Sequence, residues 1–478
     1  MSSTSTRALH SSPSRASAPA IAPALGAETQ ALLPEAASNA TARTNPLSVL
    51  PLKVVLRSLA TTTISSSPLL LRPSMAIMSA LAHSASPLLD PDRNPVLRFL
   101  LKHTFYAQFC AGEDAGEVRR TIASLKRDIG FTGVILGYAR EVVMSEAQTR
   151  ELTSDAGIQN CATVDECVRN EIVPWAAGNM ETVRLASPGD FVALKFTGAG
   201  RMALYALSGQ QAPPKALADA TDRICELAAA RGVRLLFDAE QQAVQAGIDD
   251  WTLRYMSRYN TDGRAVVYGT YQAYLKATPR VLSAHLGAAS RGGFALGVKL
   301  VRGAYLGSDP RHLMHDSKAD TDAAYDGIAE AVLTRQWSGP LAGAGSGGVG
   351  FPVVDMVLAS HNAESVRKGR AIVEGGRARA TDVAFAQLQG MADEVSCELV
   401  ASRAAAAAGA ADGPGNDMGA PAVRSYKYLV WGTTGECMKY LLRRAQENRD
   451  AVQRTRSGRD AMVGEVVRRI RGMFGQCR

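Results

Sequence analysis

Eight short apolar runs, each separated from the next by a longer stretch of helical character, constrain the fold of this chain more than any other feature of its sequence. The runs are rich in β-branched residues, whereas the intervening stretches carry alanine, leucine and charged residues at helical spacing. This alternation predicts a strand and a helix in turn along the chain. The predicted strands are residues 133–138, 191–196, 234–238, 265–271, 296–301, 355–361, 382–387 and 426–431.

Strands that alternate with helices pair in parallel through right-handed crossovers. Eight such units predict an α/β fold, a distorted (β/α)8 barrel of the TIM type, over residues 91–460. An open doubly wound sheet is the alternative, which strand counting does not exclude. Two insertions rich in glycine or alanine, near 337–352 and 401–422, are expected to be loose surface loops.

The N-terminal region has the composition of a targeting segment. Its first 27 residues are rich in Ser, Thr, Ala and Pro, contain Arg7 and Arg15, and have no acidic residue before Glu28. This is typical of an organelle transit peptide, and a disordered tail without a function is the alternative. We expect a transit peptide and low-complexity leader, disordered or helical, over residues 1–90, and a C-terminal tail over residues 461–478.

Charge and cysteine content argue against several classes of protein. The net charge of +8 is spread along the chain without a basic run interleaved with aromatic residues, so no nucleic-acid partner is expected. Attraction to an anionic membrane surface stays open. The seven cysteines include no C-x-x-C pair, so neither a disulfide framework nor a metal site is expected. No run of 18 apolar residues occurs, and a membrane-spanning helix is therefore not expected.

One glycine-rich motif is a false lead. Residues 343–348 match G-x-G-x-x-G, which binds dinucleotide phosphates only between a strand and the start of a helix. Pro340 precedes this motif and Phe351 and Pro352 follow it, so neither element is expected there. We expect no phosphate site at this motif.

Polar residues recur at the ends of the predicted strands. In a (β/α)8 barrel the carboxyl ends of the strands surround one mouth, where active sites form, so one fold gathers these side chains into one pocket. Singly, each has a structural alternative: Asp238 as a helix N-cap, Lys195 in an ion pair, His361 as a cap or a core side chain. The residues are Lys195, Asp238, Gln272, Lys299, Arg302, His361, Asn362 and Gln387.

A helix near the C-terminus carries a cationic face. Tyr440, Arg443, Arg444 and Glu447 are spaced so that they share one side of a helix. Guanidinium groups bind carboxylates through two hydrogen bonds, so this face suits an amino acid or another carboxylate as substrate. A solvated face of ion pairs is the alternative.

Several motifs, in order over about residues 95–455, together resemble the proline dehydrogenase (proline oxidase) family. They are the segments 235–240 around Asp238, 270–274, 300–305, 360–362, 385–391 and 440–448. The resemblance implies a distorted barrel that binds noncovalent FAD at the strand ends without a Rossmann domain. It also implies oxidation of L-proline to 1-pyrroline-5-carboxylate, with electrons passed to a membrane quinone. The family's eukaryotic members and the long leader point to mitochondria, on the matrix side of the inner membrane as a peripheral protein.

The resemblance also assigns roles to residues. Lys195, Asp238, Arg443 and Arg444 are expected to act in catalysis, the two arginines by holding the proline carboxylate. The substrate pocket is expected to comprise Tyr305, Leu388, Tyr428, Tyr440, Arg443 and Arg444. The expected cofactor contacts are Asp238, Gln272, Lys299, Val301, Gly303, Ala304, Ser360, His361, Asn362, Gln387, Arg444 and Glu447.

Two positions depart from the family pattern: Asp309 stands where a glutamate is usual, and Lys299 replaces an arginine of some members. Three alternatives remain open. A hydroxyproline dehydrogenase is the nearest, although Tyr428 is expected to crowd a ring hydroxyl. The others are a barrel that binds without catalysis, and a flavin-free lyase or aldolase with Lys195 as its Schiff base.

Overall fold

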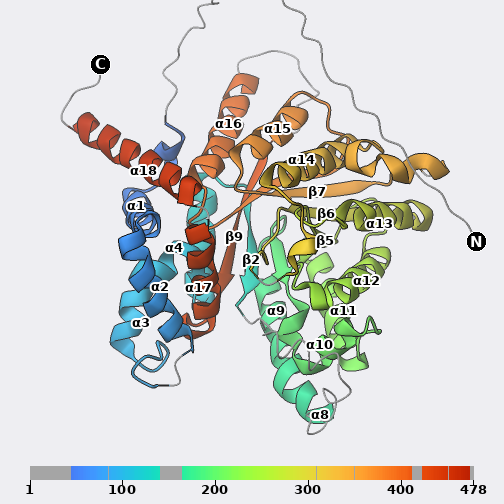
Figure 1. The fold of residues 1–478 in the computed structure, drawn as a ribbon, viewed down its shortest axis with the longest axis horizontal. Coiled ribbons are helices and arrows are strands. Elements are labelled where there is room, and N and C mark those ends of the chain that lie inside the picture. The colour runs from blue at the N-terminus through green and yellow to red at the C-terminus, as the bar shows by residue number, and fades with distance from the viewer. Residues whose placement is uncertain are drawn as a thin grey trace, which may run out of the picture. The chain divides into compact units, whose positions relative to one another are not determined.

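The computed structural model describes residues 45–83, 86–139, 164–307, 309–348, 350–411, 423–450 and 452–473. Within these ranges nine strands pair in parallel. They are β1 (Cys110–Gly112), β2 (Gly133–Tyr138), β3 (Phe191–Leu194), β4 (Arg234–Phe237), β5 (Val267–Gln272), β6 (Leu296–Val301), β7 (Val354–Ala359), β8 (Asp382–Leu388) and β9 (Arg424–Trp431). Strands β2 to β9 pair in chain order, and β9 also pairs with β2, which closes an eight-stranded barrel (Figure 1). The predicted barrel is confirmed, and the open sheet is excluded.

Helices cover the outside of the barrel, as expected for crossover connections. The main covering helices are α9 (Val173–Leu185), α11 (Lys215–Ala230), α12 (Gln242–Tyr259), α13 (Thr278–Gly292), α14 (Lys318–Thr334), α15 (Ala363–Glu374) and α16 (Asp393–Ala411). The shorter helices are α4 (Ala107–Phe109), α5 (Ala115–Ala123) and α8 (Val164–Cys167), which precede α9, and α10 (Arg201–Ser208), which precedes α11. The largest buried cluster fills the space between strands β3 to β8 and these helices.

The barrel interior is closed at the amino-terminal ends of the strands. The rings of Tyr268 and Tyr426 lie 5.4 Å and 5.1 Å from that of Phe191 and meet it edge-on. The Arg234 guanidinium lies 3.7 Å from the Phe191 ring centre, and its Nη1 is 2.6 Å from Asp382. This aromatic plug leaves the carboxyl-terminal mouth as the place where polar side chains can reach a ligand.

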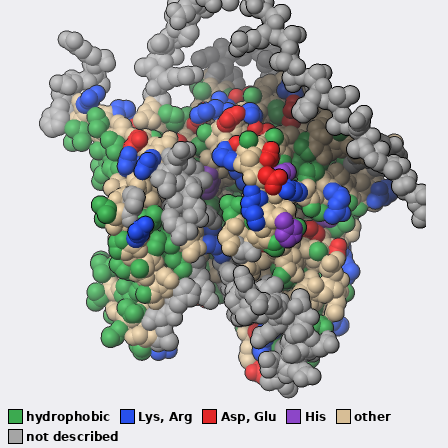
Figure 2. Space-filling model, viewed as in Figure 1, with side chains coloured by type: hydrophobic (Ala, Val, Ile, Leu, Met, Phe, Trp, Pro, Cys, Tyr) green, Lys and Arg blue, Asp and Glu red, His purple; other side chains and the backbone are tan. Residues whose placement is uncertain are grey.

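A second group of helices joins the two ends of the described chain. It comprises α1 (Leu52–Ser66), α2 (Pro68–His83), α3 (Pro95–Leu101), α17 (Thr434–Asp450) and α18 (Val452–Met473). Helix α1 packs against α18, and α2 packs against α17 (Figure 1). Much of the exposed surface of α1 to α3 is apolar (Figure 2). No single helix in the described ranges is long and apolar enough to cross a bilayer, whereas α1 and α2, which meet at a bend of 100°, meet that criterion as a pair.

Some expectations from sequence differ from the structure. Residues 52–83, expected in a low-complexity leader, form α1 and α2, and most of the expected tail 461–478 lies in α18. The alanine tract of the second insertion continues α16 to Ala411, because alanine has the highest helix propensity, while residues 412–422 lie outside the described residues. In the first insertion, η7 (Gly339–Gly347) is a 3-10 helix that buries Leu341. The expected transit peptide lies in residues 1–44, also outside the described residues.

The histidine at position 285 predicts a pH dependence of folding. It lies on α13 with its Nδ1 2.9 Å from the Tyr271 hydroxyl, and burial lowers its pKa to about 4. In the unfolded chain the imidazole has a pKa of about 6.5. Below that pH the unfolded chain binds a proton that the folded protein does not bind, so the free energy of unfolding falls as the pH decreases from about 6.5 towards 4. We expect this group to lower the free energy of unfolding by about 2 kcal/mol between pH 7.5 and pH 5. Urea unfolding of wild type and His285→Gln at both pH values tests this, and an equal pH dependence in the two proteins contradicts it.

Candidate active site at the mouth of the barrel

Asp238 is the centre of a charged cluster inside the barrel. Side chains alternate between the two faces of a strand, and this alternation directs Lys195, Asp238, Lys299 and Tyr428 inward from four different strands or strand ends. The Asp238 carboxylate accepts hydrogen bonds from Lys195 Nζ (2.7 Å), Lys299 Nζ (2.5 Å) and the Tyr428 hydroxyl (3.0 Å). The predicted convergence of strand-end residues is therefore observed for Lys195, Asp238 and Lys299, and Tyr428, which the resemblance places in the substrate pocket, joins them.

The electrostatics of the cluster fix its charge. Burial on its own would raise the pKa of Asp238, but the ammonium groups of Lys195 and Lys299 outweigh it and hold the pKa well below its usual value. Burial lowers the pKa of Lys299, and Asp238 offsets this only in part. Burial, together with the charge of Asp238, raises the pKa of the Tyr428 hydroxyl. Asp238 is thus a permanent anion near neutral pH and Tyr428 a neutral hydrogen-bond donor.

The ends of β5 and β6 present unused polar atoms beside this cluster. Gln272 Oε1 accepts a hydrogen bond from the backbone nitrogen of Ala304 (3.3 Å), but Gln272 Nε2 and Thr270 Oγ1 are buried without a hydrogen-bond partner in the described part of the chain. Thr270 pairs in register with Lys299. Gly303 packs so closely on the Tyr274 ring that a Cβ atom there would overlap it. Buried polar atoms without partners are rare in folded proteins, so this edge fits a polar cofactor.

The ends of β7 and β8 are linked by side-chain contacts. Leu388 donates its backbone N–H to His361 Nε2 (3.1 Å), and Leu388 pairs in register with Tyr428. The Ser360 hydroxyl accepts hydrogen bonds from Arg302 Nε (3.3 Å) and the Asn362 backbone nitrogen (3.1 Å). The Asn362 side-chain oxygen caps α15, so a contact from Asn362 to a cofactor would use its amide nitrogen.

Gln387 is turned away from the barrel interior. Side chains along β8 alternate between the two faces of the strand, and Ala386 faces the barrel interior, so the Gln387 side chain faces outward, towards α16. There it donates to the Ser360 carbonyl (3.2 Å) and accepts from the Ser396 hydroxyl (3.1 Å). The geometry therefore supports a positioning role for Gln387 and not the cofactor contact expected from sequence.

Helix α17 brings the predicted arginine face to the same region. Tyr440 and Arg444 are buried, with the Arg444 guanidinium 4.9 Å from the Tyr440 ring centre, and Arg443 is half-buried. Tyr440 packs in one apolar cluster with Leu388 and contributes to the raised pKa of Tyr428. Asp238, His361 and Arg444 thus belong to one neighbourhood, joined through Leu388, Tyr428 and Tyr440. Glu447 lies on α17, and its side chain is outside the described residues.

The loop after β6 carries the remaining predicted residues. Val301 ends β6, Ala304 is exposed, and Tyr305 is half-buried with its carbonyl accepting from Asp309 N (2.9 Å). Asp309, shorter than the glutamate usual in the family, accepts hydrogen bonds from the Tyr274 hydroxyl (2.5 Å) and the Gln242 backbone nitrogen (3.2 Å). Sequence reasoning missed this bridge between loops. It also missed Thr270, which the period of two from Gln272 places on the inner face.

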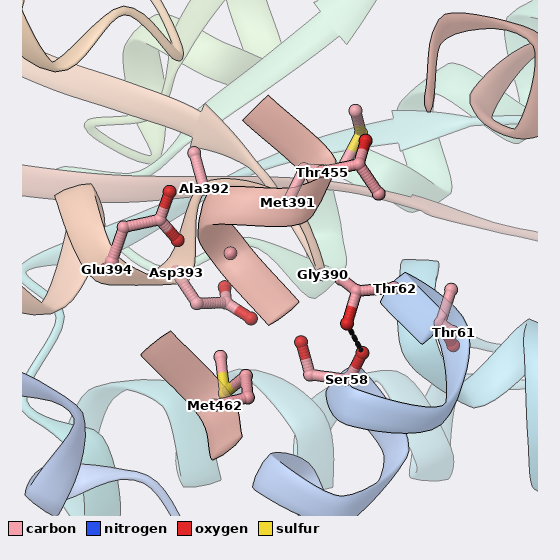
Figure 3. A pocket seen from close by; sticks show the side chains of 11 residues that line it. Ser58, Thr61, Thr62, Gly390, Met391, Ala392, Asp393, Glu394, Thr455 and Met462 are labelled. Atoms are coloured by element: carbon pink, nitrogen blue, oxygen red, sulfur yellow. Dashed lines mark hydrogen bonds between the residues drawn. The ribbon is translucent and has the colours of Figure 1, made fainter. Parts of the chain in front are cut away.

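Two cavities lie away from this mouth and contain none of the predicted site residues. One, of about 30 Å³ and lined by residues such as Ser58, Met391 and Asp393, holds no more than a water molecule (Figure 3). The other, of about 550 Å³, lies between α1, α5, β1 and the outer side of β9, where Arg57 and Lys427 line it. We therefore place the candidate active site at the barrel mouth on its side-chain geometry.

Comparison with known proteins agrees with this geometry. A family model described as proline dehydrogenase matches residues 118–457. The chain is 28% identical over 419 residues to a probable mitochondrial proline dehydrogenase of Schizosaccharomyces pombe, covering 79% of this chain and 81% of the relative. It is 29% identical over 407 residues to a hydroxyproline dehydrogenase of Mus musculus, covering 78% and 83%.

A solved structure shares the fold. Proline utilization A from Bdellovibrio bacteriovorus, inactivated by N-propargylglycine, superimposes with a TM-score of 0.57 at 17% identity over 83% of this chain. The chain spans 41% of the length of that protein, and at this identity the likeness concerns the fold alone. The family model, in contrast, matches well over half of the sequence and includes every predicted site residue. The chain therefore belongs to the proline dehydrogenase family.

Proposed function

We propose that this protein oxidises L-proline to 1-pyrroline-5-carboxylate with noncovalent FAD as its cofactor. The observation that carries the proposal is the Asp238 cluster inside the barrel mouth, next to a helix that presents Arg443 and Arg444. Family membership supports the substrate class. A cationic helix face beside a buried tyrosine and leucine wall suits a small apolar ring that bears a carboxylate.

The residues that would hold FAD are those whose polar atoms face the mouth. Gln272 and Thr270 offer buried atoms that lack partners in the described ranges, and Lys299 offers a positive charge beside them. Residues 301–304, Ser360, His361 and Asn362 lie at the neighbouring strand ends. FAD held by these residues would supply the acceptor for a hydride equivalent from the substrate.

The protein's own groups orient the substrate and exclude water. Arg443 and Arg444 would hold the carboxylate through two-point hydrogen bonds, and Tyr428, Tyr440 and Leu388 would enclose the ring. The nitrogen lone pair of proline must form the C=N bond as a hydride leaves C5, so the nitrogen has to be neutral. The resulting iminium ion then loses its N–H proton to water and becomes the cyclic imine. Asp238 is ionised and bound to two ammonium groups, which makes it a fixed negative charge rather than a proton carrier. Lys195 is held in the same ion pair, which disfavours a Schiff-base role.

We further infer that the electrons leave to a membrane quinone and that the protein works in mitochondria, on the matrix side of the inner membrane. The acid-poor N-terminal composition and relatives named as mitochondrial in Schizosaccharomyces pombe, Dictyostelium discoideum and Arabidopsis thaliana support this location. Oxidation of L-proline to a cyclic imine would begin its breakdown in that compartment.

Purified protein tests the proposal in two measurements. Heat-released flavin should amount to one FAD per chain, and L-proline should drive reduction of a soluble dye together with formation of a trappable cyclic imine. A protein without flavin would favour a lyase or aldolase, and a flavoprotein inert towards proline would favour a binding barrel.

Hydroxyproline is the competing substrate, because relatives that are 29% identical carry the name hydroxyproline dehydrogenase. The Tyr428 hydroxyl donates a hydrogen bond to Asp238 from the inner face of β9. The tyrosine side chain would therefore face the ring of a bound substrate. We expect kcat/KM to be higher for proline than for 4-hydroxyproline, because the ring hydroxyl would crowd Tyr428. Equal or higher kcat/KM for hydroxyproline would contradict this preference.

A further inference from the structure

The helices at the start of the described chain expose an unusual amount of apolar surface. Of the 18 large apolar side chains exposed in the described residues, 11 lie between residues 52 and 100. They are Leu52, Leu56, Ile64, Leu69, Leu70, Ile77, Leu88, Leu89, Val96, Phe99 and Leu100. We call these the apolar face; Figure 2 shows apolar side chains gathered over this part of the molecule. Scattered apolar side chains are normal on a protein surface, but a concentration of this kind marks an interaction site.

Helix α2 carries both buried and exposed apolar side chains. Leu71, Met78 and Leu81 are buried, and Met78 and Leu81 pack in one apolar cluster with residues of α17. Leu69 and Ile77, in contrast, are 88% and 60% exposed. An ordinary surface helix carries polar side chains on its exposed side, so large apolar side chains exposed on α2 mark a surface that lipid or a partner can cover. In α3 the pattern recurs, with Leu101 buried while Val96, Phe99 and Leu100 face outward.

The charge of this region favours lipid as the occupant. Neither α1 nor α2 contains an acidic residue, and both carry exposed basic side chains, Lys53 and Arg72, beside exposed leucines. Arg98 and Lys102, in contrast, are neutralised by Glu113 and Glu117. Between α2 and α3, Asp90 pairs with Arg93, and Asp92 is bound to the start of α17. Apolar side chains flanked by basic ones, as on α1 and α2, are typical of helices that lie in the interface of an anionic bilayer.

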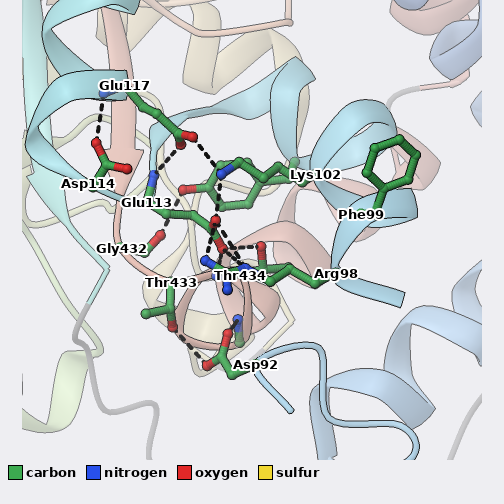
Figure 4. A network of polar contacts seen from close by, with 12 residues as sticks. Asp92, Arg98, Phe99, Lys102, Glu113, Asp114, Glu117, Gly432, Thr433 and Thr434 are labelled. Atoms are coloured by element: carbon green, nitrogen blue, oxygen red, sulfur yellow. Dashed lines mark hydrogen bonds and ion pairs between the residues drawn. The ribbon is translucent and has the colours of Figure 1, made fainter. Parts of the chain in front are cut away.

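The apolar face is fixed to the active-site helix by polar contacts (Figure 4). Glu113 accepts hydrogen bonds from Arg98, Lys102 and Thr434. Asp92 accepts hydrogen bonds from the Thr433 hydroxyl and the Gly435 backbone nitrogen, both 2.9 Å long. Thr434 is the first residue of α17, and the Phe99 ring lies apart from this network in the same view. A surface that binds lipid through α3 would therefore hold α17 and the barrel mouth at a set position above the bilayer.

We propose that the apolar face of α1 to α3 is a docking surface that lies in the interface of an anionic phospholipid bilayer. Docking would bring the flavin site near a lipid-soluble electron acceptor, and only this purpose rests on the proposed function. The surface itself is argued from exposure and charge.

Vesicle sedimentation of the full-length flavoprotein tests it, with vesicles of phosphatidylcholine containing about 30% phosphatidylglycerol. We expect wild type to sediment with these vesicles and Ile77→Glu/Phe99→Glu to bind at least about tenfold more weakly. Ile77→Ser/Phe99→Ser should also weaken binding, which separates loss of apolar contact from charge repulsion. The matched control is Val173→Glu, on α9, where the valine is 54% exposed, and it should bind as wild type does.

Two further readouts keep the outcomes distinct. Proline-dependent reduction of a soluble dye should be the same in wild type and all variants, and its absence in every protein would count against the proposed function alone. Light scattering without lipid should give the same mass for wild type and Ile77→Glu/Phe99→Glu. If these substitutions instead dissociate a dimer, the apolar face is a contact between two copies and the proposal is overturned. Vesicle binding that is absent in wild type, or unchanged in both double variants, overturns it as well.

Discussion

Replacing Asp238 by alanine is expected to lower the free energy of unfolding by about 3–5 kcal/mol and to reduce proline turnover by at least about a thousandfold. The substitution leaves two ammonium groups, whose side chains are only 17% and 8% exposed, without their counter-charge inside the barrel. It also removes the acceptor of the Tyr428 hydroxyl, so the substrate wall loses its anchor. Urea unfolding and dye reduction measure the two effects.

Two matched variants separate the causes. Asp219→Ala removes an exposed carboxylate that pairs with Lys215 one helical turn away, and it should cost less than about 1 kcal/mol. Adding Lys299→Met to Asp238→Ala removes one unpaired charge and should recover part of the stability without restoring turnover. An Asp238→Ala protein as stable as Asp219→Ala would show that the cluster is not paired as described.

The same cluster has a defined pH dependence. Because the folded-state pKa of Asp238 is depressed, its stabilising contribution is complete above the unfolded pKa of about 4 and is lost only as the pH falls through the folded value. From pH 5 upward, titration of the Asp238 carboxylate should therefore not change the difference in free energy of unfolding between wild type and Asp238→Ala. It should shrink only in stronger acid.

Replacing Arg444 by methionine is expected to raise the KM for L-proline by about a hundredfold or more, because the carboxylate loses a charge-assisted partner that methionine cannot replace. Arg444 is 5% exposed and stacks on Tyr440, so its guanidinium is held in place before substrate binds. Arg443→Met, at the half-buried neighbouring position, should act in the same direction.

Competition by pyrrolidine distinguishes loss of the carboxylate contact from general damage. Pyrrolidine has the ring without the carboxylate, so its inhibition constant should be nearly unchanged in Arg444→Met. Arg367→Met, which removes an exposed arginine on α15, should leave both proline KM and pyrrolidine inhibition as in wild type. A normal proline KM in Arg444→Met would mean that the carboxylate is held elsewhere.

The sequence predicts the barrel well because its strands are long enough to carry a pattern. Predicted and observed strands overlap at all eight positions of the closed ring. Strand β1 is missed because three residues, Cys110–Gly112, show no periodicity. Helices α1 and α2 lie in the region expected to be disordered or helical, but their bounds are not predicted. Serine, threonine and proline obscure their apolar spacing, and α17 and α18, at the far end of the chain, pack against them.

The candidate site is predicted in part for a similar reason. The position of Lys195, Asp238 and Lys299 in predicted strands or at their ends is enough to bring them to one mouth. Gln387 also stands at a strand end, but the alternation of side chains along β8 turns it outward. The sequence does not predict which of these groups pair. One carboxylate binds two lysines and a tyrosine only because four strands bring them together. The position of α17 likewise depends on its packing with α2, which no local pattern encodes.

Anaerobic titration of the purified protein with L-proline, followed by flavin absorbance near ~450 nm, tests most directly whether one mouth holds cofactor and substrate together. Stepwise bleaching by proline, with one equivalent per chain and a strong loss of sensitivity in Arg444→Met, is the expected result. Flavin absorbance that proline leaves unchanged, or a protein that carries no flavin, would contradict it.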